Sequence, residues 1–181
     1  MHFKEFAEWF HEHIAEIRNV EDVSSDIIWI SRRPSFFVRS YKGYILNGVK
    51  FHTTDLSTSR KTQNNGVFVS ATTSTYLRNP NDAPSIGDLS YHGTLENVFE
   101  ACYRHDSLKY PLFRCKWYDG LKTDEFGIVS VKTSTSKFGE EPFIFAEQAQ
   151  QCFYIKDPLE VIRSFVLKKH PRELFDMDDD N

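Results

Sequence analysis

The segment Pro-Leu-Phe-Arg-Cys-Lys-Trp-Tyr-Asp-Gly (residues 111–120) places a thiol between two cationic side chains. A catalytic cysteine needs a neighbouring base, cation or helix N-terminus that lowers the pKa of its thiol. In a strand, however, successive side chains point to opposite faces, so Arg114 and Lys116 lie on the face away from Cys115. Cys115 instead shares its face with Phe113 and Trp117. We therefore interpret it as a small packing residue, and the same interpretation holds for Cys102 and Cys152.

Aromatic side chains gather on the neighbouring predicted strands and offer a different chemistry. Several aromatic rings beside a carboxylate can form a cage that binds a methylated ammonium group through cation–π contacts. The alternative, which burial statistics favour for each ring taken singly, is that they are core and girdle residues of a small barrel. The predicted ligand-binding residues are Trp117, Tyr118, Tyr91, Tyr103 and Asp119.

A basic, polar loop over residues 58–65 is a candidate contact for phosphate groups. The chain carries 22 basic and 26 acidic residues, and a net charge of -4 disfavours tight non-specific binding to nucleic acid. Direct DNA binding is therefore the rival hypothesis, and it requires a local basic face. Its predicted residues are Arg60, Lys61, Arg32 and Arg33, with Arg39 as a further contact.

Familiar enzyme signatures are missing from the sequence. It has no phosphate-binding loop, no dinucleotide-binding glycine motif and no Gly-x-Ser-x-Gly elbow. His11 and His13 are two positions apart on a predicted helix, so they point to opposite sides and cannot share a metal. Asp119, Asp124 and Glu125 cluster after a predicted strand, where acids usually cap backbone N–H groups. We predict a non-enzymatic protein without metal or cofactor; an enzyme of unfamiliar type is the alternative.

The periodicity predicts one N-terminal helix followed by about eight strands. Apolar residues recur every three or four positions up to residue 17, and later runs are short and rich in branched and aromatic residues. Asn47-Gly48 between two apolar runs predicts a two-residue hairpin turn. The predicted strands are 27–31, 35–41, the hairpin 43–53, 66–71, 89–103, 110–119, 126–132, 143–155 and 160–169, with loops at 54–65 and 73–88 and one helical turn near 146–151.

These elements predict a mostly β (α+β) fold, a small curved antiparallel sheet or barrel with the N-terminal helix packed on it. We divide the chain into an N-terminal helix (1–20), a β-rich domain (26–175) and an acidic tail (176–181). Three cysteines without a paired motif, no signal peptide and no membrane-length apolar run predict an intracellular, soluble protein.

Six segments in order resemble one known family. They are "YILNGVKFHTTD", "KTQNNGVFVSA", "YHGTLENVFEACY", "YPLFRCKWYDG", "EPFIFAEQAQQCFYIKDP" and "HPRELFDM", spread over about residues 3–177. Together they resemble the uncharacterised domain encoded beside the transposase in plant CACTA (En/Spm-type) DNA transposons. The chain departs from that pattern at Asn65 and Glu147, where the family commonly has Ser, and at Phe165, where it often has Trp. The resemblance implies a plant, transposon-derived, nuclear protein.

The stretch over residues 91–120 is also similar, at the level of the fold, to the strand pair of bromo-adjacent-homology (BAH) chromatin domains, which implies a BAH/SH3-like barrel. In this resemblance Trp117 corresponds to a cage tryptophan. The expected function is a binding module for protein or chromatin recognition, with a histone tail or a transposase-associated protein as the partner. The alternatives are a DNA-binding accessory protein of a transposase, with DNA as the partner, and a domesticated inhibitor or toxin-like factor.

Overall fold

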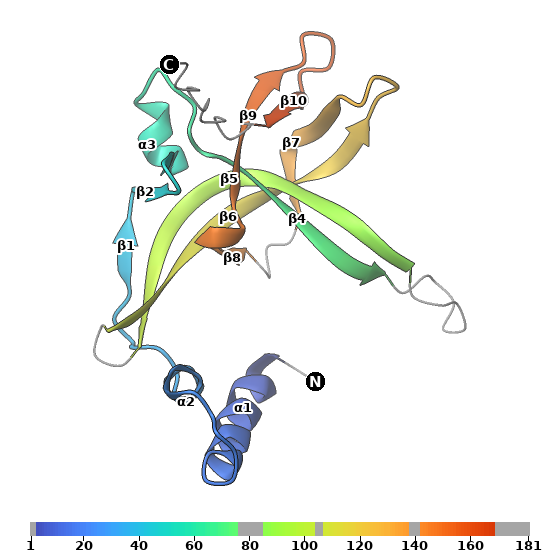
Figure 1. Cartoon of the computed structure of the whole chain (residues 1–181). Coiled ribbons are helices and arrows are strands. Elements are labelled where there is room, and N and C mark those ends of the chain that lie inside the picture. The colour runs from blue at the N-terminus through green and yellow to red at the C-terminus, as the bar shows by residue number, and fades with distance from the viewer. Residues whose placement is uncertain (1–2, 76–84, 104–106, 138–141, 169–181) are drawn as a thin grey trace, which may run out of the picture.

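Helices occupy the N-terminal part of the chain in the computed structural model, which describes residues 3–75, 85–103, 107–137 and 142–168. They are α1 (Phe3–Ile17), α2 (Ser25–Ser31) and α3 (Thr54–Thr58). α1 packs against α2, and Figure 1 shows this pair below the arch of the sheet. The predicted N-terminal helix is confirmed. Its main contact is with α2, however, and not with the sheet, on which the sequence predicts it to pack.

Ten strands follow in the described part of the chain. They are β1 (Arg39–Tyr41), β2 (Gly43–Leu46), β3 (Val49–His52), β4 (Gly66–Thr75), β5 (Ser85–Tyr103), β6 (Leu108–Thr123), β7 (Val129–Lys137), β8 (Phe143–Phe145), β9 (Gln150–Lys156) and β10 (Arg163–Lys168). A short 3₁₀ turn, η1 (Ala146–Gln148), joins β8 to β9. Eight strands form one antiparallel sheet, and β2 and β3 form a separate hairpin. The mostly β prediction is confirmed.

Six strands of the sheet close into a barrel. The ring closes because β5 pairs with β6 as well as with β4, although β5 and β6 lie far apart in the strand order of the sheet. The ring continues from β6 to β7, β10 and β9, and β9 pairs back with β4. β1 and β8 pair with the outer parts of β5 and β6. Figure 1 shows the long β4–β5 and β6–β7 pairs crossing at the barrel and then diverging.

The strands bury two separate cores on their two faces. The barrel interior contains Phe68, Val131, Cys152 and Val166, with Tyr118, Val129 and Tyr154 packed around them. The outer face of β4, β5 and β6 carries the larger core, which the β2–β3 hairpin and η1 cover. Its most buried members are Phe51, Val67, Leu95, Val98, Phe113 and Ala146. Side-chain alternation along β6 therefore separates Cys115 and Trp117 from Tyr118, as the sequence predicts.

Gly93 allows β5 and β6 to approach closely where the barrel closes. It pairs with Trp117, and a Cβ added there would collide with the carbonyl oxygen of Lys116 and lie 2.9 Å from the Trp117 ring. Because backbone atoms cannot move aside as a flexible side chain does, only glycine fits at this position. The predicted hairpin turn is also confirmed, with positive φ at Asn47 (49°) and Gly48 (74°).

The sequence-based assignment of residues 27–31 as a strand is wrong: they belong to α2. Ser24 caps this helix by accepting a hydrogen bond from the Ile27 amide at 3.4 Å, and Asp26 lies in the first turn. Local capping thus overrides the β propensity of the three isoleucines. The predicted strand 35–41 is likewise reduced to β1, since Phe36 and Phe37 are exposed.

The polar segments contain more regular structure than the sequence indicates. Part of the predicted loop 54–65 is the helix α3. The predicted loop 73–88 is wrong at both ends, because β4 continues to Thr75 and pairs there with Ser85 of β5. Its middle, residues 76–84, lies outside the described residues, as does the predicted acidic tail.

Candidate functional site: a pocket in the fork between two strands

The fork between β5 and β6 contains a pocket of about 240 Å³, which we call the fork pocket. The two strands pair as far as Gly93 and Trp117; beyond that point β5 follows β4, and β6 follows β7. The divergence leaves a space bordered by one strand on each side. Its lining residues are Leu89, Ser90, Tyr91, His92, Tyr118, Asp119, Gly120, Leu121 and Val131.

His92 is the most unusual residue of the fork pocket. It is only 2% exposed, and its ring stacks on Phe68 with the centroids 5.8 Å apart. Neither Nδ1 nor Nε2 has a well-formed hydrogen bond within the described residues. Burying a polar group without a partner costs free energy, so such a side chain in a pocket wall indicates a missing partner, either water or a ligand.

Electrostatics keep His92 neutral. Burial, together with the positive charge of Lys168, lowers its pKa to about 4, and a contact with the Ser90 backbone offsets part of this shift. Lys168 Nζ lies 4.6 Å from the centre of the Phe68 ring, on which His92 also stacks. At neutral pH the imidazole therefore offers one N–H donor and one nitrogen acceptor, and it carries no charge.

Tyr118 forms the opposite wall and is held in place by two contacts. Its hydroxyl lies 3.3 Å from Thr94 Oγ1, and its ring meets Tyr154 edge-on at 5.3 Å. The Tyr154 hydroxyl in turn donates to the Gly93 carbonyl at 2.9 Å. Burial raises the pKa of Tyr118, and the hydrogen bond to Thr94 offsets this only in part. The phenol therefore stays protonated at neutral pH and keeps a fixed orientation.

Asp119 and Gly120 form the rim of the fork pocket at an irregularity of β6. The register between β6 and β7 shifts on both sides of Asp119, and Gly120 adopts a positive φ of 63°. Asp119 Oδ1 accepts the Gly120 amide hydrogen at 2.6 Å. The Gly120 carbonyl accepts from Nη2 of the buried Arg163 at 2.8 Å. Hydrogen bonds to both the N–H and the C=O group of Gly120 thus fix the rim.

The predicted cage residues do not form one site. Trp117 is 4% exposed in the outer core, so little of its ring remains for a ligand, and Tyr91 packs edge-on against it at 6.4 Å. Tyr103 lies at the far end of β5, where it packs against Tyr110 at 5.9 Å. The fork pocket therefore gathers Tyr91, Tyr118 and Asp119 from the predicted set.

His92 is the residue that sequence reasoning missed, because it belongs to no catalytic or metal-binding motif. The available signal was its position in a strand: it alternates with Tyr91 and Gly93 and shares a face with Thr94. A titratable side chain on the inward face of a predicted barrel strand is an unusual feature, because such positions are mostly apolar.

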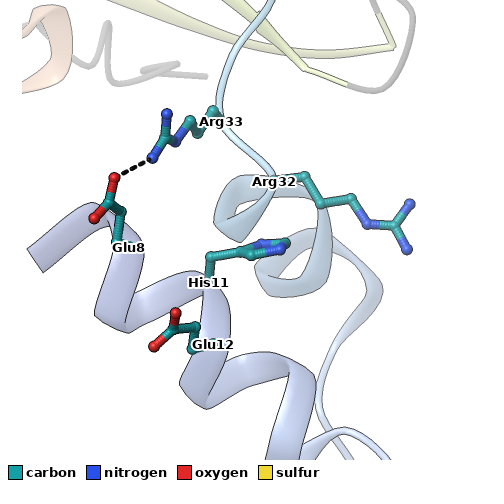
Figure 2. Close-up of a pocket in the computed structure, with 5 residues that line it drawn as sticks. All are labelled: Glu8, His11, Glu12, Arg32 and Arg33. Atoms are coloured by element: carbon teal, nitrogen blue, oxygen red, sulfur yellow. Dashed lines mark hydrogen bonds and ion pairs between the residues drawn. The ribbon is translucent and has the colours of Figure 1, made fainter.

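The predicted basic residues fall into two places at opposite ends of the molecule. Arg32 and Arg33 follow α2, whereas Arg60 and Lys61 follow α3 (Figure 1). A second pocket, of about 280 Å³, lies between α1 and α2 (Figure 2). Arg33 Nη2 pairs there with Glu8 Oε1 at 3.4 Å.

The same α1–α2 pocket mixes acidic and basic side chains. Glu12 lines it beside Glu8, while Arg32 extends away from α1 (Figure 2). The Arg32 guanidinium lies over the Trp29 ring, 4.7 Å from its centre. His11 Nδ1 is 3.1 Å from the Ser31 carbonyl oxygen and links the two helices. The two acids reduce the positive potential that a DNA phosphate would meet here.

The thiols are expected to be unreactive in the folded protein. Cys102, Cys115 and Cys152 are all at most 3% exposed. Burial raises the pKa of Cys115 well above its ordinary range and that of Cys152 to about 12, and the thiol form is a poor nucleophile. An Ellman assay at pH 8 should detect no fast-reacting thiol in native protein and three after unfolding in guanidinium. A thiol that reacts at once in the native protein would contradict this prediction.

The described residues contain neither a metal-binding cluster nor a membrane-spanning helix. No group of three or more His, Cys, Asp or Glu side chains is arranged to hold a metal ion. No helix among them is both long and apolar enough to cross a membrane.

Part of the chain matches a known family. Residues 99–164 are similar to a family described as "Domain of unknown function (DUF4216)". No curated protein and no solved structure matches the chain. The matched segment begins within β5, contains β6 to β9, and ends at the start of β10. It therefore includes the β6 and β7 walls of the fork pocket, whereas the β5 wall precedes it. Over these residues, which make up less than half of the chain, the protein is similar to an uncharacterised domain family.

Proposed function

We propose that this protein is a non-enzymatic binding module that recognises a segment of a protein partner through the fork pocket. One observation carries the proposal: Tyr118 and Asp119 surround a pocket whose buried wall, His92, has two ring nitrogens without a well-formed hydrogen bond among the described residues. A largely preformed pocket with a few fixed polar groups is the usual form of a ligand site.

The chemistry of the fork pocket favours a side chain with an uncharged hydrogen-bonding end. Neutral His92 can pair with such an end group, and Leu89 and Val131 supply apolar walls for its stem. Lys168 disfavours a cation beside His92. The buried cysteines disfavour the rival hypothesis of an enzyme that uses a thiol nucleophile.

The resemblance to the domain of plant CACTA transposons suggests where such a partner occurs. A transposon-derived protein would act in the nucleus, on a histone tail or a transposase-associated protein. The match of residues 99–164 to an uncharacterised domain is compatible with this origin. The sequence resemblance to BAH chromatin domains suggests the same class of partner, but its cage residue, Trp117, is buried, so we propose the fork pocket in place of that cage.

The test is an array of overlapping peptides from core histone tails, probed with the full chain and followed by affinity measurements in solution. The decisive variant is His92→Phe, which keeps a ring against Phe68 and removes both ring nitrogens. Losing one hydrogen bond to a buried ligand group should weaken binding about tenfold. Tyr41→Phe, in the exposed strand β1, is the control and should bind as the wild type does.

A parallel titration with a short DNA duplex at two salt concentrations tests the rival function. Binding of DNA that falls steeply with salt, together with no peptide binding, would contradict the proposal. Equal peptide affinity of the wild type and His92→Phe would also contradict it, because the peptide would then not bind in the fork pocket.

A further inference from the structure

A third, smaller pocket lies where β6 pairs with β8, away from the fork pocket. It has a volume of about 200 Å³ and is lined by Tyr110, Pro111, Phe145 and Glu147; we call it the edge pocket. β8 is the last strand of the sheet, and Phe145 is 52% exposed there. None of these four residues belongs to the fork pocket.

The aromatic rings of the edge pocket stand at steep angles to one another. Phe145 pairs in register with Leu112, which places its side chain beside that of Tyr110 on one face of the sheet. The ring centroids of Tyr110 and Phe145 are 6.2 Å apart, with 65° between the planes. Tyr103 supports Tyr110 from behind, at 5.9 Å and 84°. Tyr110 and Phe145 thus form two aromatic walls at a steep angle, and the electron-rich face of an aromatic ring attracts cations.

Glu147 closes the edge pocket with a negative charge whose position is fixed by the turn η1. Ala146 is fully buried, and the side chain of Gln148 accepts the Phe145 amide hydrogen at 3.0 Å, so the residue between them projects outward. Within the described residues Glu147 makes no hydrogen bond or ion pair. Lys109 lies on the opposite face of β6, where it pairs with Glu100 at 3.6 Å.

We infer that the edge pocket binds the ammonium group of a lysine side chain, in its methylated form, on a protein partner. The charge of the pocket is complementary to a cation, its walls are aromatic, and the described residues place no basic side chain in its lining. A methylated ammonium has the advantage over a bare one because it sheds water more easily when it meets ring faces. The inference does not depend on the fork pocket, since the two pockets share no residue and suit different chemical groups.

The test uses two small probes that differ only in charge. One is N-acetyl-trimethyllysine amide, and the other is its neutral isostere, in which carbon replaces the quaternary nitrogen. Each is titrated into the full chain, and the aromatic side-chain signals are followed by NMR. We expect the cationic probe to bind about tenfold more tightly than the neutral one, as a partly desolvated cation–π site should.

Matched variants assign the site. Tyr110→Leu keeps apolar bulk without a ring, and Glu147→Gln keeps shape without charge; each should weaken binding of the cationic probe about three- to tenfold. The controls are Phe126→Leu and Glu125→Gln, which replace an aromatic ring by Leu and a carboxylate by its amide in an exposed loop. They should leave the affinity unchanged, and so should His92→Phe, which separates this test from that of the fork pocket.

Equal affinity for the two probes would overturn the inference, because the pocket would then recognise the shape of the probe and not its charge. Unchanged binding by both Tyr110→Leu and Glu147→Gln would also overturn it and would place the cation elsewhere. Thermal melts of every variant show whether a loss of binding reflects unfolding. If Tyr110→Leu unfolds, the comparison of Glu147→Gln with Glu125→Gln alone decides whether the cationic probe binds in the edge pocket.

Discussion

Acidification from pH 7 to pH 4 is expected to lower the free energy of unfolding by about 3 kcal/mol through His92 alone. Its pKa is about 4 in the folded protein and 6.5 in the unfolded chain. Between these values the unfolded chain binds more protons than the folded one, so stability falls as the pH decreases through this window. Below pH 4 both states are protonated and the effect levels off.

Urea denaturation of the wild type and of His92→Phe at pH 7, 6, 5 and 4 measures this contribution. The difference in unfolding free energy between the two proteins should change by about 3 kcal/mol over the series. His52 also has a pKa lowered by burial and by the charges of Arg60 and Lys50, and it adds an effect of the same sign to both proteins. Parallel curves for the two proteins would contradict a buried, neutral His92.

The second large effect is expected for Arg163→Met, because Arg163 holds together three strands. Its side chain is 2% exposed, and it donates to Gly120 O at 2.8 Å, Ser130 O at 3.0 Å and Ser130 Oγ at 2.9 Å. Removing it leaves buried carbonyl oxygens without these donors and should cost about 3 kcal/mol of stability. Because Gly120 lines the fork pocket, the variant should also weaken peptide binding.

Arg114→Met is the matched control for this prediction. Arg114 is 48% exposed and pairs with Glu96 at 3.6 Å on the surface, so its loss should change stability by about 0.5 kcal/mol or less. Denaturation at pH 7 compares the two variants directly. If they lose equal stability, the hydrogen bonds of Arg163 do not stabilise the fold in the way proposed.

Features that depend on a few neighbouring residues could be predicted from the sequence. The Asn47-Gly48 turn needs only local backbone freedom, and alternation along β6 suffices to separate Trp117 from Tyr118. The strand assignment failed at residues 27–31, where an N-cap serine and a packing partner, α1, stabilise a helix against β propensity. Propensity is a weak guide where capping and tertiary contacts act together.

The site itself depends on pairing between distant segments, which explains why it was predicted only in part. Closure of the barrel, and thus the fork, requires β5 to pair with both β4 and β6. The sequence identifies Tyr91, Tyr118 and Asp119 by residue type, but the fork places His92 among them and leaves Tyr103 near the far end of the same strand. Burial of Trp117 likewise depends on the β2–β3 hairpin, which covers its face of the sheet.

The most direct test of the proposed recognition site is NMR of protein labelled with ¹⁵N in the histidine rings, with and without the best peptide from the array. We predict that the ring nitrogens of His92 shift on binding, while those of His11 and His13 on α1 stay unchanged. Tight binding of the peptide without any change at His92 would contradict recognition through the fork pocket.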